Sequence, residues 1–217
     1  MLKVGLTGGI AAGKSVVGEM FVALGAHLVQ ADKIAHSLME SGQAVYGEVV
    51  RHFGPGILNP DRSINRSKLA EAAFGTETTS RNDRIDELNR IVHPAVIRRQ
   101  DEWMDAVSIE DPRGVAIVEA ALILEAGAAS HFDRLIVVTC DPEPRAARFA
   151  VRQKIDLESA RKEVARRMAA QLPDSEKVKA AHYVIDNSGT LEAMHRQVQQ
   201  VWEKLRADGG TTRKSAT

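Results

Sequence analysis

A short glycine-rich stretch near the start of the chain has the residue types needed to hold phosphate groups. Gly8, Gly13, Lys14 and Ser15 fit the pattern G-x-x-x-x-G-K-[ST]. Glycines allow successive N–H groups to point at one anion, and a helix beginning at about Gly13 adds the positive end of its dipole. The Lys14 ammonium group can reach the β- and γ-phosphates, and the Ser15 hydroxyl can ligate Mg²⁺. The stretch therefore predicts a nucleoside-triphosphate site.

The context of this stretch argues against a chance glycine-rich turn beside a lysine. An apolar segment at 2–6 precedes it, and an amphipathic helical pattern at 14–24 follows it, which is the strand–loop–helix order that phosphate binding requires. The candidate nucleotide contacts are Gly8, Gly9, Ala11, Ala12, Gly13, Lys14, Ser15 and Val16.

Two carboxylates follow predicted strands. Asp32 comes after the second strand, where it can take a proton from an acceptor hydroxyl, although Asp is also a favoured helix N-cap. Glu119 ends the third strand, where a carboxylate commonly assists Mg²⁺ or caps the next turn. Both are candidates for chemistry beside the phosphate loop, because ligands collect at the carboxyl ends of parallel strands.

Arginines gather further along the chain. Guanidinium groups suit phosphate oxygens, yet most arginines on such helices are simply solvated, and the pattern alone does not choose among them. They are Arg145, Arg148, Arg152, Arg161, Arg166 and Arg167.

A guanine-nucleotide switch is disfavoured as the use of this loop. Its D-x-x-G element should follow a strand, whereas the match at 111–114 precedes one, and N-K-x-D is absent. Small-molecule phosphoryl transfer is the better interpretation.

The order of the elements predicts an α/β, P-loop NTPase fold with a parallel sheet of about five strands and helices on both faces. The predicted strands are 2–6, 26–30, 115–118, 135–139 and 183–185. The predicted helices are 14–24, 67–74, 81–107, 144–152, 157–171 and 191–206.

The spacing of these elements predicts one kinase domain with two additions. Its core comprises 1–32, 115–150 and 181–206; a helical substrate lobe occupies about 33–114, and a mobile lid about 150–180. The small polar residues of 207–217 predict a flexible tail.

The composition is that of an ordinary globular protein, with 44% hydrophobic and 27% charged residues. Lys+Arg and Asp+Glu both number 29, so no net charge draws the chain to nucleic acid or membrane. We find neither a signal peptide nor a bilayer-spanning run, so we expect a cytoplasmic protein. The single cysteine, Cys140, lies in an apolar run and is expected to be buried.

Besides the phosphate loop, the chain contains the segments 31–36 (A-D-K-I-A-H), 64–66 (I-N-R), 91–94 (I-V-H-P), Arg167 with Gln171, and 185–187 (I-D-N). In their order and spacing, these motifs resemble the dephospho-coenzyme A kinase family over nearly the whole chain.

This resemblance implies transfer of phosphate from ATP, with Mg²⁺, to the ribose 3′-hydroxyl of dephospho-coenzyme A. It makes Asp32 the base, Lys14 and Ser15 the phosphate and Mg²⁺ residues, and Arg148 and Arg167 the lid arginines that stabilise transferring charge. Asn187 joins the nucleotide contacts. Expected substrate contacts are Asp32, His36, Arg66, His93, Glu119 and Leu122, although His36 and His93 can equally be local hydrogen-bonding residues.

Four positions depart from the family pattern. Glu119 stands where Asp is usual, Ala121 where Pro is usual, Arg145 where Gln is usual and His182 where Asp is usual. The longer Glu119 side chain bears on Mg²⁺ coordination. Another small-molecule or nucleoside kinase, and a nucleotide-gated binding module without transfer activity, therefore remain open alternatives at this point.

Overall fold

A computed structural model describes residues 1–74 and 81–211 of the chain. It divides into two compact units, one formed by Met1–Gln30 with Met104–Thr217 and the other by Ala31–Trp103. The first carries the sheet and the phosphate-binding loop, and the second is built from helices.

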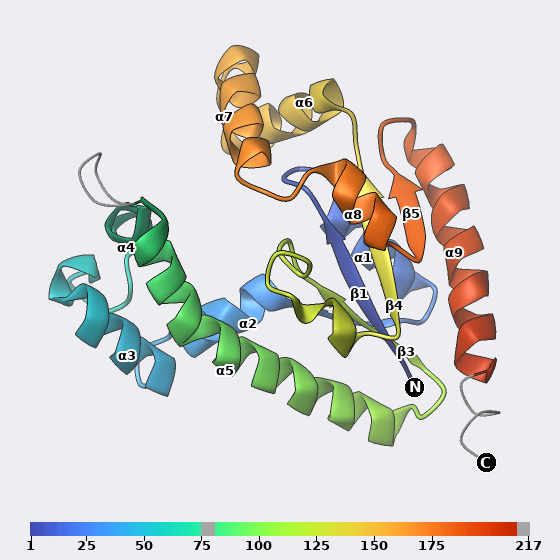
Figure 1. Cartoon of the computed structure of the whole chain (residues 1–217), viewed down its shortest axis with the longest axis horizontal. Helices are drawn as coiled ribbons and strands as arrows, with labels where there is room; N and C mark the ends of the chain where they lie inside the picture. The colour runs from blue at the N-terminus through green and yellow to red at the C-terminus, as the bar shows by residue number, and fades with distance from the viewer. Residues whose placement is uncertain (75–80, 212–217) are drawn as a thin grey trace. The chain divides into compact units, whose positions relative to one another are not determined.

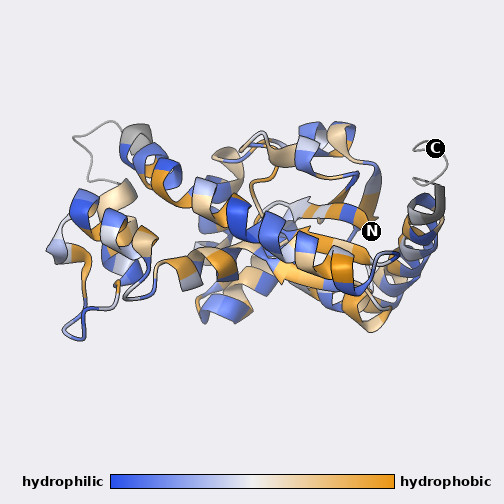
Figure 2. Cartoon of the chain, turned by 90° about the horizontal axis from the view of Figure 1, so that it is seen from below, coloured by the Kyte–Doolittle hydropathy of each residue, from blue (hydrophilic) through white to orange (hydrophobic). Residues whose placement is uncertain are grey.

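The first unit contains a five-stranded sheet in the order β2-β3-β1-β4-β5, with every neighbouring pair parallel. The three central strands are almost entirely buried and the two edge strands are partly exposed, and Figure 2 draws much of the sheet in the orange of hydrophobic residues. The predicted α/β fold with five parallel strands is confirmed. The strands are β1 (Leu2–Gly8), β2 (His27–Gln30), β3 (Val115–Glu119), β4 (Arg134–Thr139) and β5 (Tyr183–Asp186).

Alternate residues of β4 face opposite layers of the unit. Ile136 and Val138 join the core formed with α1 (Lys14–Ala23) and α9 (Leu191–Thr211), where the Phe21 and Trp202 rings lie 6.3 Å apart. Leu135 and Val137 pack instead against Ile123 and its neighbours on the other face. Figure 1 shows α9 running along the sheet.

Three further helices follow β4. They are α6 (Pro142–Gln153), α7 (Leu157–Ala169) and α8 (Asp174–Ala180). Phe149, Ala160 and Val164 form the small core between α6 and α7. The sequence did not predict α8, because its one buried side chain is a lysine, Lys177, which pairs with Glu125 at 2.8 Å. A helix with no apolar stripe gives no periodic signal.

The end of α9 is more ordered than the tail predicted for 207–217. The helix continues to Thr211 because Asp208 accepts hydrogen bonds from Arg134 Nε (2.7 Å) and Tyr183 Oη (2.6 Å). Residues 212–217 lie outside the described part of the chain. The prediction missed this because the anchoring partners are on distant strands.

The second unit holds α2 (Ala31–Leu38), α3 (Ala44–Phe53), α4 (Arg66–Phe74) and most of α5 (Arg81–Glu110). Val49, Ile57 and Leu69 are buried within it. Pro94 lies inside α5, so the His-Pro motif belongs to a continuous helix and not to a turn. Each predicted strand and helix is present, while α2 and α3 were not among the predicted helices.

Candidate active site

The phosphate-binding loop connects β1 to α1, and its glycines are required by space as well as conformation. Gly8 has φ 152° and Gly13 has φ 96°. A methyl group at Gly8 would run into the Val138 carbonyl, and one at Gly13 would run into the Asn187 amide. Ala11 also adopts a left-handed conformation, with φ 53°. The loop is therefore tightly wrapped against β4 and the residue after β5.

Lys14 begins α1 and lies over the loop. Its ammonium group donates to the Gly8 carbonyl (2.9 Å) and the Gly9 carbonyl (3.2 Å). This places a positive charge at the same end of α1 as the positive end of the helix dipole. The combination is suited to polyphosphate.

A carboxylate lies directly beside the loop. Ser15 Oγ donates to Glu119 Oε1 at 2.7 Å, and Gln30 Nε2 donates to Glu119 Oε2 at 2.8 Å. Gln30 and Glu119 are register partners of β2 and β3. Glu119 is only 8% exposed, so a buried carboxylate that accepts from one hydroxyl and one amide group lies at the edge of the loop. The Ser15 hydroxyl oxygen and the Glu119 carboxylate oxygens are the ligand types that Mg²⁺ prefers.

The predicted residues Arg148 and Asn187 meet behind the loop. Arg148 donates to the Asn187 carbonyl (2.9 Å) and side-chain oxygen (3.1 Å), and Asn187 Nδ2 donates to the Ala12 carbonyl (2.8 Å). Arg148 also contacts Cys140 Sγ at 3.1 Å. Cys140 is buried as expected, and its burial raises the pKa of the thiol. The structure thus brings two of the predicted nucleotide residues to the loop.

Three other predicted residues of the sheet unit have different surroundings. Arg167 on α7 donates to Glu163 (2.6 Å) and lies over the Phe149 ring. Val16, in the first turn of α1, and Leu122, after β3, are both partly exposed. They can meet a ligand from solvent, but their positions alone assign them no role.

The second unit contains Asp32, His36, Arg66 and His93. Asp32 is the second residue of α2, so it lies in the first turn and not at the cap. The pKa of His36 is lowered mainly by burial and then by the Arg66 charge, while Asp32 opposes the shift. Burial lowers the pKa of His93. Asp32, His36 and Arg66 therefore form one electrostatic group within this unit.

Sequence reasoning missed several residues that hold the loop. Gln30 could have been found by aligning the ends of β2 and β3. Arg145 was one of six candidate arginines and a departure from the family pattern, but nothing marked it as a residue that holds the loop, and Asp174 gave no signal. Gln171, which the resemblance singled out, accepts a hydrogen bond from the Ile10 N–H at 3.2 Å.

Two negative findings apply to residues 1–74 and 81–211. No group of three or more His, Cys, Asp or Glu side chains there could hold a metal ion. None of their helices is long and apolar enough to cross a membrane.

Comparisons with known proteins identify the family of this chain. The family model described as dephospho-CoA kinase matches residues 2–193. The dephospho-CoA kinase of Aquifex aeolicus is 40% identical over 96% of this chain and 100% of its own length. That of Leifsonia xyli is 36% identical over 95% and 100%.

A solved structure leads to the same family of folds. A crystal structure from Thermus thermophilus has a TM-score of 0.77 and 29% identity, covering 94% of this chain and 97% of that chain. The match of the family model and the identity to the two relatives show that this chain belongs to the dephospho-CoA kinase family.

Proposed function

We propose that this chain transfers the γ-phosphoryl group of ATP to the ribose 3′-hydroxyl of dephospho-coenzyme A, the final step of coenzyme A synthesis. Family membership over residues 2–193 supports the reaction. The observation that carries it is the phosphate loop with Ser15 bonded to a buried Glu119 at 2.7 Å, since this pair suits a kinase that handles a metal–nucleotide complex.

Binding of ATP rests on the loop and on the residues that hold it. The N–H groups of the loop and the start of α1 face the phosphates, and Lys14 exchanges its carbonyl partners for phosphate oxygens. Asn187 and Arg148 support the loop from behind, and the proposed role of Arg148 requires it to exchange its Asn187 partners for the transferring phosphate. Arg167 supplies a second guanidinium group from α7.

The residues at the loop fit Mg²⁺. Ser15 Oγ and Glu119 supply two hard oxygen donors, and no dedicated protein cage is needed because Mg²⁺ usually takes its other ligands from phosphates and water. When bound there, Mg²⁺ neutralises charge on the phosphate oxygens. Gln30 donates a hydrogen bond to Glu119 Oε2 at 2.8 Å, so that Glu119 Oε1 faces Ser15. This orientation accommodates the glutamate found at position 119.

Asp32 is the proposed base. It follows Gln30 by two positions in the chain. As the acceptor hydroxyl oxygen forms its bond to the γ-phosphorus, the bond to the β–γ bridging oxygen breaks and ADP leaves. The hydroxyl proton passes to the Asp32 carboxylate.

Each unit, taken by itself, contains residues that the sequence assigns to the acceptor. His36, Arg66 and His93 are offered by the helical unit, and Glu119 and Leu122 by the sheet unit. The low pKa of His36 and His93 keeps both rings neutral near pH 7, where they can donate or accept hydrogen bonds. The expected partners are small molecules. The cytoplasmic location expected from the sequence stays a prediction.

The test is ADP release from ATP and Mg²⁺, measured with and without dephospho-coenzyme A. We expect acceptor-dependent turnover that Lys14→Ala removes. A panel of nucleosides and small alcohols identifies the acceptor class, because another kinase of this fold would prefer a different member. Tight ATP binding with no phosphorylated acceptor would overturn the proposal and favour a binding module.

A further inference from the structure

Ile10 lies at the tip of the phosphate-binding loop, and both its N–H and its carbonyl group bond to side chains from outside the loop. The Ile10 N–H donates to Gln171 Oε1 at 3.2 Å. The Ile10 carbonyl accepts from Arg145 at 3.4 Å. Neither partner belongs to the phosphate-binding motif. The position of the loop tip therefore depends on side chains from the segment after β4.

Arg145 is the centre of this arrangement. Its side chain is 0% exposed, and its Nε donates to the Cys140 carbonyl at 2.6 Å. The guanidinium group also pairs with Asp174. A fully buried charge persists only where its donors are matched by acceptors, and each of the three guanidinium nitrogens here has one. Arg145 is thus a fixed part of the site and not a solvated lid arginine.

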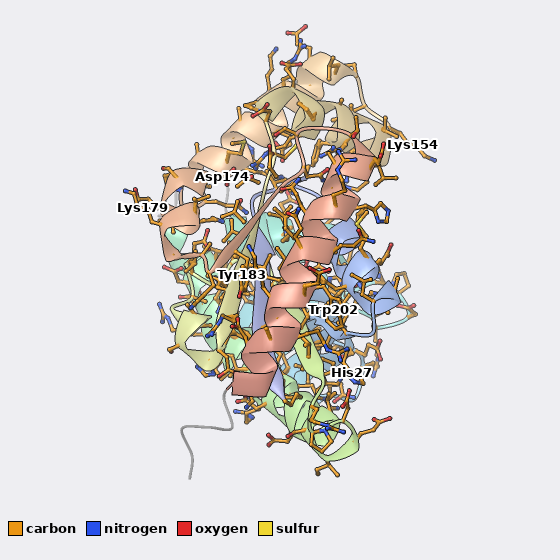
Figure 3. The ribbon with its side chains drawn as sticks, turned by 90° about the vertical axis from the view of Figure 1, so that its right-hand side faces the viewer. His27, Lys154, Asp174, Lys179, Tyr183 and Trp202 are labelled. Carbon is orange, nitrogen blue, oxygen red and sulfur yellow. The ribbon has the colours of Figure 1, made fainter. Side chains whose placement is uncertain are left out.

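Gly9 shows how closely these side chains approach the loop. A methyl group added at Gly9 would meet the Arg145 guanidinium group and the Asp174 carboxylate. Asp174 opens α8, as Figure 3 shows, and Gln171 lies in the connection between α7 and α8. The loop tip is consequently bonded to α6 and to this connection, and Arg145 joins it indirectly to the start of α8.

We propose that Arg145, Gln171 and Asp174, here termed the loop brace, are positioning residues that couple ATP binding to the packing of the α7–α8 segment. The inference rests on the proposed function in so far as ATP is the ligand of the loop. The brace holds Ile10 while Ala11 takes its left-handed conformation, so the loop N–H groups stay aimed at the phosphates.

Coupling of this kind is reciprocal. If the brace favours the loop conformation that binds phosphate, then bound ATP must stabilise the α7–α8 segment by the same free energy. A change in the loop brace should therefore alter two quantities together, which are the affinity for ATP and the amide protection of residues 170–180. A purely structural contact would change stability without linking these two.

The decisive variant is Gln171→Met, which keeps the length of the side chain and removes the acceptor for the Ile10 N–H. Loss of one such hydrogen bond should weaken ATP binding about five- to ten-fold. Measured without acceptor by titration calorimetry, the variant should show this loss while its Tm stays close to that of the unmodified protein. KM for ATP should rise more than kcat falls.

Hydrogen exchange supplies the second readout. In the unmodified protein, ATP should slow amide exchange across residues 170–180, and Gln171→Met should reduce this protection. The matched control is Arg161→Gln, because Arg161 joins α7 to Glu143 on α6 through an exposed ion pair and does not contact the loop. It should leave ATP affinity and protection unchanged.

Arg145→Gln tests the centre of the brace and should weaken ATP binding more than Gln171→Met does. Should that variant fail to fold, Gln171→Met decides alone. Equal ATP affinity and equal protection in Gln171→Met and the unmodified protein would overturn the coupling while leaving the kinase intact. Absence of ATP binding in the unmodified protein would overturn the proposed function and the coupling with it.

Discussion

The two units of this chain hold their candidate residues in different ways. In the sheet unit, Glu119, Asn187 and Arg145 are buried and each makes several hydrogen bonds. In the helical unit, His36 is partly exposed and Arg66 is exposed, and the Arg66 charge acts on the pKa of His36. The residues proposed for the nucleotide are held by packing, whereas those proposed for the acceptor are linked by charge. Substitutions should therefore damage the first through structure and the second through chemistry.

Asp32→Asn should produce the largest effect and is the strongest test of whether the helical unit acts through chemistry and not through stability. Loss of the base should lower turnover by about 10²- to 10⁴-fold, with the free energy of unfolding and ATP affinity nearly unchanged. Steady-state ADP release measures the first, and urea unfolding the second. Glu40→Gln, just after α2, is the control. Unchanged turnover in Asp32→Asn would remove Asp32 from the mechanism.

Glu119→Gln should instead lower both ATP binding and stability, because it alters a buried carboxylate. We expect Mg²⁺-dependent ATP binding to weaken by about ten- to a hundred-fold. Some loss of stability should accompany this, because the carboxylate accepts from both Ser15 and Gln30. Calorimetric titration of ATP with and without Mg²⁺ provides the measurement.

Gln30→Ala is the companion to this variant and should cause a smaller loss of the same kind, because it frees Glu119 to rotate. If Glu119→Gln bound Mg²⁺–ATP as tightly as the unmodified protein, the proposed Mg²⁺ site would be wrong.

A smaller effect is expected from Glu163→Gln on α7, which lies in the sheet unit but is partly exposed. Hydrogen bonds from Arg166 and Arg167 lower the pKa of Glu163 to about 2. Because the folded pKa lies below the unfolded value, the stabilisation is present above about pH 4.5 and is lost as the pH falls toward 2.

Solvent screening limits this contribution, so we expect a loss of only about 0.5 to 1 kcal/mol in the free energy of unfolding at pH 7. Urea unfolding at pH 7 and pH 3 checks it, and Glu158→Gln, whose pair with Lys162 is fully at the surface, is the control. A loss as large at pH 3 as at pH 7 would contradict the ion-pair origin.

The weakest expected effect is a pH dependence of stability in the helical unit. The pKa values of His36 and His93 are lowered on folding, so below pH 6.5 the unfolded chain takes up protons that the folded chain excludes. Stability should therefore be complete above pH 6.5 and decline as the pH falls below it. Urea unfolding between pH 7.5 and 5.5 should show a decline that His36→Gln with His93→Gln reduces; an identical decline in that double variant would contradict the assignment.

The sequence alone determined the parts of this protein that depend on local pattern. Apolar runs without polar alternation predicted the strands, because a parallel strand is buried on both faces. The glycines, Lys14 and Ser15 predicted the loop, because phosphate binding demands those residue types at that spacing. Glu119 was predicted beside the loop from its place at the end of a strand.

Only the tertiary structure decided how these parts are held. Arg145 and Asp174 gave no signal of an ion pair, since they are distant in sequence and a buried charge looks like a solvated one until its partners are known. Helix α8 lacks an apolar stripe because Lys177 is its buried residue. The end of α9 is fixed by Asp208 with partners on β4 and β5. Contacts of this kind arise from packing between distant segments, which local pattern does not encode.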